Sequence, residues 1–175
     1  MAIRELSYLG DAVLRQKTDP VELFDDELDT LVDDLVETMY ANMGIGLAAP
    51  QVGDSRRVTV VDVSEARDGT EVLELINPGL VSRSGTIGSE EGCLSIPGVV
   101  ENIERSAEVE VEYQDRNGDR HTVQGVDLLS RVLQHELDHL EGILFIDHLG
   151  TLRRDIAVRE FKIAMAENDL PVGPV

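Results

Sequence analysis

The stretch that most constrains the fold is the hexapeptide Gln-His-Glu-Leu-Asp-His at residues 134–139. It lies within a run, residues 126–141, in which leucine and valine recur every three or four positions, and Gly142 follows the run. This spacing predicts a helix with one apolar face. His135 and His139 are four residues apart, so a helix places both imidazoles on the same face. The chain must therefore accommodate a helix that presents two nitrogen ligands to one point.

A glutamate between the two histidines suggests what this helix does. Glu136 is rotated by about 100° from His135 around the helix axis, so it can reach a group bound at a metal without being a ligand. Two histidines and this glutamate on one helix are the arrangement of metallohydrolases, in which the glutamate is the general base. The alternative is an ordinary amphipathic helix that carries two polar histidines.

The remaining pattern predicts an α+β fold. Apolar residues at helical spacing predict an N-terminal helix within residues 24–43 and a last helix over residues 152–165. Segments rich in β-branched residues predict short, mostly antiparallel strands packed around the central His-Glu-x-x-His helix. These strands are expected at 58–63, 72–76, 80–84, 107–113 and 120–123, with Asn77-Pro78 ending one strand and 80–84 pairing with it. The glycine-rich segments 44–53 and 85–98 are expected to be irregular.

Length and composition limit the number of domains, the cellular location and the partners that we expect for this chain. The 175 residues show no repeat or linker, which favours one catalytic domain over residues 1–175 with a frayed tail at 170–175. The sequence has no apolar run of membrane-spanning length and no secretory signal, and its single cysteine excludes an internal disulfide, so we expect a cytoplasmic protein. The net charge of −20 disfavours DNA and anionic membranes as partners. Because salt screens such self-repulsion, we also expect a salt-adapted organism; the alternative is an acidic protein from a mesophile.

Two histidines leave a tetrahedral metal site short of ligands. The candidates for a third ligand are Cys93, His121, His148 and several carboxylates. Cys93 is favoured because it lies in a glycine-flanked segment that can direct a thiolate at the helix, although a lone cysteine is more often a small buried apolar residue. We expect His121 to be exposed and His148 to be structural.

Three stretches together resemble the three signature motifs of the peptide deformylases. They are Gly-Ile-Gly-Leu-Ala-Ala-Pro-Gln at 44–51, Glu-Gly-Cys-Leu-Ser at 91–95, and the hexapeptide at 134–139. The resemblance extends in order over nearly the whole chain, and the three motifs are far more specific together than His-Glu-x-x-His alone. It implies that the substrate is a nascent chain beginning with N-formylmethionine, and that the products are formate and a free amino terminus.

The resemblance also implies roles for residues. The metal would be bound by Cys93, His135 and His139, with water as a further ligand. Glu136 would be the general base and then the general acid, and Gln51 with the backbone N–H of Leu94 would form the oxyanion hole. The metal would be Fe(II), with zinc, nickel or cobalt in the purified protein, whereas ligand chemistry alone favours zinc.

The resemblance places the substrate backbone beside Gly44, Ile45 and Gly46. Ile45, Leu94 and Val132 are candidates for an apolar methionine pocket, with core packing as the alternative for Val132.

The sequence departs from the family pattern in one respect, which concerns how the peptide beyond methionine is held. Many family members carry an arginine soon after the cysteine motif, but here the next cation is Arg105. Asp138 is a candidate for orienting a ligand histidine, or else a solvent-facing carboxylate.

Two other functions would use the same helix. A zinc peptidase would need a downstream ligand such as Glu160, and a structural metal site would need a fourth ligand, His121 or His148.

The last helix carries a local excess of two positive charges. It holds two acidic residues, Asp155 and Glu160, and four cations, Arg153, Arg154, Arg159 and Lys162. These cations either pair with acidic neighbours or, as the resemblance supports, dock weakly on ribosomal RNA.

Overall fold

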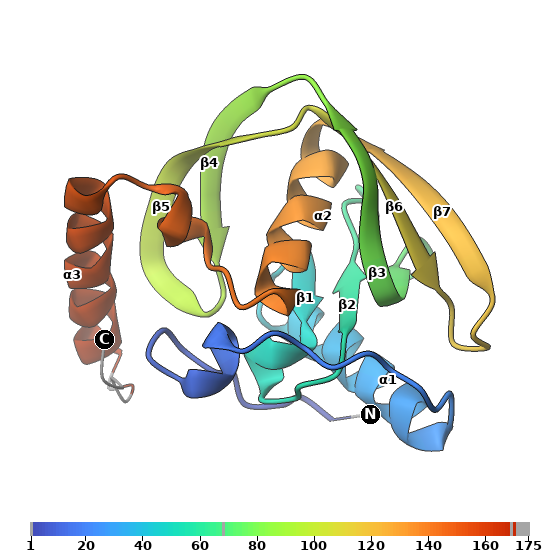
Figure 1. Cartoon of the computed structure of the whole chain (residues 1–175). Coiled ribbons are helices and arrows are strands. Elements are labelled where there is room, and N and C mark those ends of the chain that lie inside the picture. Colours follow the sequence, from blue (N-terminus) through green and yellow to red (C-terminus); the bar gives the residue numbers. More distant parts are fainter. Residues whose placement is uncertain (1, 68, 169, 171–175) are drawn as a thin grey trace.

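The computed structural model describes residues 2–67, 69–168 and 170, and residues 171–175 of the tail expected at 170–175 lie outside this part of the chain. The described residues form three α-helices and seven strands (Figure 1). The predicted N-terminal helix is α1 (Asp26–Ala41), which is shorter by two residues at each end than the apolar pattern. It begins there because the Asp25 carboxylate accepts hydrogen bonds from the backbone N–H groups of Glu27 and Leu28.

Five strands form an antiparallel sheet in the order β1-β2-β3-β6-β7. Their bounds are β1 Gly46–Ala48, β2 Val58–Val61, β3 Leu73–Ser84, β6 Glu108–Gln114 and β7 Arg120–Val126. The prediction of antiparallel strands is confirmed. The strand β1 lies at one edge of this sheet, directly before a 3-10 turn at Ala49–Val52, so the segment 44–53 is more regular than expected.

The expectation for residues 72–84 was wrong. Asn77-Pro78 does not end a strand, because β3 continues through it to Ser84 with shifts in register between Ile76 and Gly79. The distorted backbone is visible in the positive φ of 52° at Asn77. The far half of β3 pairs with β6 and not with the near half of its own strand.

The second glycine-rich segment is also more regular than expected. Residues 85–98 contribute to an antiparallel hairpin of β4 (Ile87–Cys93) and β5 (Ile96–Arg105). This hairpin is separate from the five-stranded sheet. Cys93 is therefore the last residue of a strand, and not part of an irregular loop.

The central helix is α2 (Asp127–Leu140), and it lies between the sheet and the hairpin (Figure 1). Val132 and Leu133 pack against Val61, Leu75 and other apolar residues of the sheet, which fixes the helix rotation. Its opposite side faces the hairpin, so two layers meet on the helix that carries the histidines.

The last helix, α3 (Thr151–Glu167), packs on β5 (Figure 1). Its buried residues Ala157, Phe161 and Met165 join the apolar cluster that contains Val99 and Ile103 of β5. The helix therefore supports the back of the hairpin. Among the described residues, no helix has the length and apolar character needed to cross a membrane.

Candidate active site

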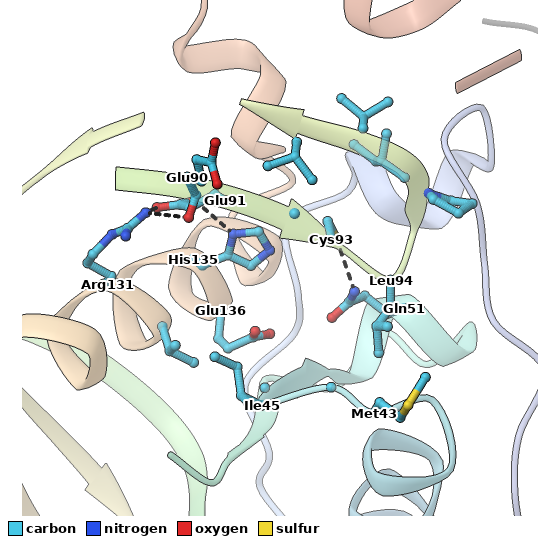
Figure 2. Close-up of a pocket in the computed structure, with 18 of the residues that line it drawn as sticks. Met43, Ile45, Gln51, Glu90, Glu91, Cys93, Leu94, Arg131, His135 and Glu136 are labelled. Atoms are coloured by element: carbon cyan, nitrogen blue, oxygen red, sulfur yellow. Dashed lines mark hydrogen bonds and ion pairs between the residues drawn. The ribbon is translucent and has the colours of Figure 1, made fainter. Parts of the chain in front are cut away.

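A cavity of about 480 Å³ opens between α2, the β4–β5 hairpin and the segment that leads from α1 into β1 (Figure 2). Three regions that are distant in sequence thus meet at one place. The lining includes nearly every site residue predicted from the sequence: Gly44, Ile45, Gly46, Gln51, Cys93, Leu94, Val132, His135 and Glu136. The remaining one, His139, lies one helical turn beyond His135 and adjoins Cys93.

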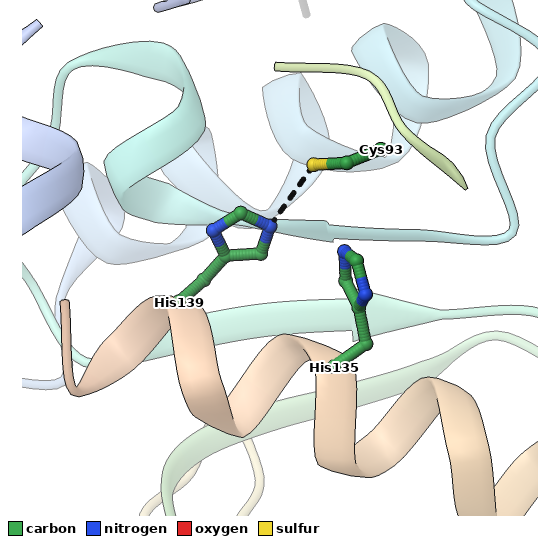
Figure 3. A group of neighbouring side chains, drawn as sticks. All are labelled: Cys93, His135 and His139. Carbon is green, nitrogen blue, oxygen red and sulfur yellow. Dashed lines mark hydrogen bonds between the residues drawn. The ribbon is translucent and has the colours of Figure 1, made fainter. Parts of the chain in front are cut away.

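The structure brings the three predicted metal ligands together (Figure 3). One ligand atom from each of Cys93, His135 and His139 lies within 4.8 Å of the others. The Cys93 Sγ atom is 3.2 Å from Nε2 of His139. The two other candidate histidines are elsewhere: His121 contacts Asp115 at 2.9 Å, and His148 contacts Asp138 at 2.7 Å.

A buried glutamate orients one histidine of this cluster. The Nδ1 atom of His135 is 3.1 Å from Oε2 of Glu91, which leaves its Nε2 atom for the cluster. The Glu91 carboxylate also accepts hydrogen bonds from Arg105, at 2.7 and 3.0 Å, and from Arg131, at 3.1 Å. Burial alone would raise the pKa of Glu91, but the hydrogen bonds from His135 and Arg105 lower it to about 2. Glu91 is therefore ionised and fixed in place.

Sequence reasoning proposed Asp138 for this orienting position and did not single out Glu91. In the structure, Asp138 accepts a hydrogen bond from Arg105 and contacts His148, and both distances are 2.7 Å. The signal for Glu91 was its spacing, because residues two apart in a strand share one face. Once β4 is known to be a strand, Glu91 and Cys93 are expected to face α2 together.

Glu136 lies in the cavity wall with only 3% of its surface exposed. Its Oε2 atom is buried without a hydrogen-bond partner. Burial raises the pKa of Glu136 to about 7, against the lowering effect of the positive charge on His135. A carboxyl with such a pKa can both accept and release a proton near neutrality.

The buried donor set fits a divalent metal ion. Burial lowers the pKa of His135, but its contacts with Cys93 and Glu91 outweigh this effect and raise the pKa to about 10. Burial, followed by the charge on His135, lowers the pKa of His139 well below its ordinary value. The cluster thus favours one positive charge at its centre. One sulfur and two imidazole nitrogens are ligands that zinc and other late first-row metals accept, and a metal would displace the proton.

Gly46 keeps the floor of the cavity open. A Cβ atom at this position would collide with the Glu136 carboxylate and would lie 2.9 Å from Cγ1 of Val132. Only glycine therefore lets β1 pass this close to the glutamate. The carbonyl of Gly44 accepts a hydrogen bond from Arg67, a contact that sequence reasoning did not identify.

The Gln51 side chain is held at the cavity by both ends of its amide. Its Oε1 atom accepts a hydrogen bond from the backbone N–H of Ala48 at 2.9 Å. Its Nε2 atom donates to Oγ of Ser95 at 3.1 Å and lies 3.5 Å from Sγ of Cys93. The orientation of the amide is thus fixed, with its N–H group beside the metal-ligand cluster (Figure 2).

Comparison with known proteins gives one consistent family. A sequence model of the polypeptide deformylases matches residues 3–155. The chain is 45% identical to a peptide deformylase of Acidobacterium capsulatum over 93% of this chain and 95% of that protein. It is 49% identical to a peptide deformylase of Nitrosococcus oceani over 88% of this chain and 91% of the relative.

Solved structures agree with these relatives. The crystal structure of a peptide deformylase from Legionella pneumophila superposes with a TM-score of 0.91 at 43% identity, covering 97% of this chain and 100% of that one. A peptide deformylase from Synechococcus elongatus in complex with actinonin gives a TM-score of 0.83 at 40% identity, covering 97% and 89%.

Proposed function

This chain belongs to the polypeptide deformylase family, and from that premise we propose the roles of the residues in its cavity. The protein is a metal-dependent hydrolase that removes the formyl group from N-formylmethionine at the start of nascent polypeptides, releasing formate. The observation that carries the assignment of residues is the cluster of Cys93, His135 and His139, which adjoins the buried carboxylate of Glu136.

We assign the metal to Cys93, His135 and His139, with Glu91 holding the orientation of His135. The assignment is supported by the convergence of one sulfur and two imidazoles in a buried cluster. We propose Fe(II) in the cell, with zinc, nickel or cobalt able to replace it in purified protein. A divalent ion held by these three residues would supply Lewis-acid chemistry, which would acidify a water molecule and polarise the formyl oxygen.

The chain's own groups carry the protons and the developing charge. Glu136 takes a proton from the attacking water and delivers it to the departing amine nitrogen, and burial supports this role by raising the pKa of its carboxyl. Nε2 of Gln51 and the backbone N–H of Leu94 donate hydrogen bonds to the oxyanion. Loss of one such donor costs on the order of 10²–10³ in turnover.

The substrate backbone is proposed to lie along residues 44–46. The strand β1 has β2 as its one neighbour in the described sheet order, so a peptide can add at its other edge. Ile45, Leu94 and Val132 line the same cavity and are assigned to the methionine side chain. This contact recognises the peptide backbone and one apolar side chain, which suits an enzyme that acts on many nascent chains.

The direct test is formate release from a formyl-Met peptide, measured beside cleavage of the same peptide without the formyl group. The expected result is formate from the first peptide and no internal cleavage of either one. Cleavage of the unblocked peptide would instead favour the zinc peptidase, with Glu160 as the downstream ligand. No reaction with either peptide by metal-loaded protein would favour a structural metal.

We further propose a cytoplasmic enzyme that acts as one catalytic domain over residues 1–175, in a salt-adapted organism, with neither DNA nor a membrane as partner. Weak docking of α3 on the ribosome is part of this proposal. Arg153 and Arg154 form ion pairs with Glu101 and Asp147, which reduces the charge that α3 offers and is consistent with weak docking.

The docking is tested by co-sedimentation with ribosomes over a salt series. The wild type is compared with a variant in which Arg153, Arg154, Arg159 and Lys162 are changed to Gln. We expect the wild type to bind more at low salt, because phosphate contacts weaken as salt rises. Equal binding of the two proteins would contradict the docking and leave the catalytic roles unchanged.

A further inference from the structure

Three polar side chains form a network behind the segment that leads into β1. Tyr40 lies near the end of α1, Asp62 directly follows β2, and Arg67 lies in the connection from β2 to β3. The Tyr40 hydroxyl donates a hydrogen bond to Oδ2 of Asp62, and the Arg67 guanidinium lies over the Tyr40 ring, 5.6 Å from its centroid. Of these three described residues, none lines the active-site cavity. The roles proposed above therefore do not use them.

The network holds two successive backbone carbonyls at the edge of the cavity. Arg67 donates a hydrogen bond to the carbonyl of Gly44, and the backbone N–H of Asp62 donates to the carbonyl of Ile45 at 2.9 Å. Gly44 and Ile45 line the cavity and directly precede β1. Because each peptide group is planar, fixing these carbonyls also fixes the directions of the N–H groups of Ile45 and Gly46. The network thus orients the backbone along which the substrate is proposed to lie.

Arg67 is held in place by its own connection and by a buried charge. Its backbone N–H donates to Oγ of Ser64 at 3.1 Å, and the N–H of Ser64 donates to Oδ1 of Asp62 at 2.8 Å. Asp62 is buried. Burial raises the pKa of Asp62, but the hydrogen bonds to its carboxylate and the nearby charge on Arg67 outweigh burial and lower it. Asp62 is therefore ionised and attracts the guanidinium.

The backbone at Arg67 indicates a role beyond the structure of its own connection. Its φ of 46° lies in the left-handed region, which costs free energy for a residue that has a Cβ atom. The chain accepts this cost and places the guanidinium on a carbonyl that lies 23 residues earlier. Strained residues of this kind occur where the surrounding contacts fix a geometry that function requires.

We propose that Arg67 is a positioning residue for the peptide substrate. With Tyr40 and Asp62, it holds residues 44–46 in the conformation that pairs with the substrate backbone, and it contacts neither the substrate nor the metal ligands. This inference rests on the proposed function, because it requires the formylated peptide to lie along β1. An edge that is ordered in advance lowers the entropy cost of binding. Loss of the guanidinium should therefore weaken binding and leave the proton transfers at Glu136 unchanged.

The test compares formyl-Met-Ala-Ser, which is long enough to extend along β1, with formyl-Met, which ends at the methionine. Arg67→Met keeps an unbranched side chain and removes its hydrogen-bond donors. We expect kcat/KM for the tripeptide to fall by about tenfold, as for the loss of one hydrogen bond from a charged group. The change should lie mainly in KM, and kcat/KM for formyl-Met should change by less than about twofold.

Two further variants and one control locate the effect. Arg67→Lys keeps a cationic donor and should recover part of the lost activity on the tripeptide. Tyr40→Phe removes the hydroxyl that bonds Asp62 and should raise KM for the tripeptide by a smaller factor. The control is Arg83→Met, which removes the same charge at an exposed arginine of β3, outside the active-site cavity. It should keep wild-type kinetics on both substrates.

Hydrogen exchange gives a readout that does not depend on activity. Backbone amides exchange faster where local structure opens more easily. Mass spectrometry of metal-loaded protein should show faster exchange over residues 44–48 in Arg67→Met than in the wild type. Exchange in α2 should be the same in both proteins, because the network does not hold that helix.

Equal factors of loss for the tripeptide and formyl-Met in Arg67→Met would overturn the inference, since a general effect on the fold would then be responsible. Unchanged kinetics together with unchanged exchange in this variant would also overturn it, as would an Arg67→Lys protein that is as impaired as Arg67→Met. If Arg67→Met does not fold, Tyr40→Phe and Arg67→Lys decide by the same comparison. No formate from the wild type with either substrate would instead contradict the proposed function, and the exchange experiment would still decide the positioning.

Discussion

At the scale of single residues, Glu136 has the most demanding environment. Its carboxylate is buried near His135, and its Oε2 atom has no hydrogen-bond partner. We predict that Glu136→Gln retains the metal but lowers kcat by at least about 100-fold, since the amide cannot exchange the proton. Metal analysis and formate release on the same sample measure both properties. The control is Glu160→Gln at an exposed site on α3; wild-type activity in Glu136→Gln would exclude the residue as the base.

The raised pKa of Glu136 gives a second prediction, for the pH dependence. A group with a pKa near 7 is protonated below that pH and cannot then accept a proton from water. A bound cation would lower this pKa, so kcat/KM should fall on the acid side of a midpoint at or below about 7. The profile is measured in buffers of constant ionic strength. Activity that rises as the pH decreases through this range would contradict a basic role.

Cys93 offers a test of the metal cluster that does not depend on activity. Its side chain is half-buried and lines the cavity, so small reagents can approach it. We predict slow alkylation by iodoacetamide in the metal-loaded protein and fast alkylation after chelation, because coordination occupies the sulfur. Mass spectrometry measures the rate at this single cysteine. Equal rates in the two states would remove Cys93 from the ligand set.

At the scale of secondary-structure elements, the sequence predicted the helices well and the hairpin poorly. Regular apolar spacing identified α2 because Val132 and Leu133 must face the sheet. The strand β5 lacked a comparable signal. Its buried positions include the charged residues Glu101 and Arg105, while the apolar Val100 is exposed. The alternation of apolar and polar residues is lost when inward-facing positions hold charged side chains. Such residues can be recognised as buried only after their ion-pair partners are known.

The candidate site shows the same difference between local sequence signals and contacts made by distant segments. Spacing on one helix put His135 and Glu136 in one site, and the resemblance to the deformylase motifs added Cys93, because each motif keeps its chemistry in a few adjacent residues. Spacing could not reveal that Arg105 and Arg131 hold Glu91, since these partners lie on different elements. Contacts between distant segments depend on packing, which the local pattern does not contain.

The support of β5 by α3 is open to a direct test. Phe161 is fully buried between the helix and the hairpin. We predict that Phe161→Ala lowers the free energy of unfolding by about 3–5 kcal/mol, as expected for a large side chain removed from a core. The control is Ile163→Ala on the same helix, where the isoleucine is 59% exposed. Thermal unfolding of metal-loaded samples compares them, and equal losses would contradict the packing role.

At the scale of the whole molecule, the dominant property is charge. Several arginines are engaged by more than one acidic group; Arg116, for example, bonds both Glu74 and Asp33. These contacts use the scarce positive charge within the fold and leave an acidic surplus outside. The self-repulsion of that surplus opposes the compact state until salt screens it.

We therefore predict that the Tm rises between about 0.1 and 1 M salt, over which the screening length falls from about 10 Å to 3 Å. An increase of at least about 2–4 °C corresponds to about 1 kcal/mol for a protein of this size. Calorimetry of the metal-loaded protein measures it. The control changes four exposed glutamates, Glu22, Glu71, Glu160 and Glu167, to Gln. This variant should respond less, and a Tm independent of salt would contradict the prediction.

The spacing of Glu91 and Cys93 on β4 has a consequence for how the gene tolerates change. Both side chains face α2, one on His135 and the other on His139. Adding or removing one codon between them would turn one of the two to the opposite face of the strand, because strand faces alternate with every residue. A three-nucleotide insertion there would separate the ligand from the group that orients its partner, although the reading frame is kept. Insertions and deletions in descendants of this gene should therefore be absent between these two codons. They should occur instead in surface turns.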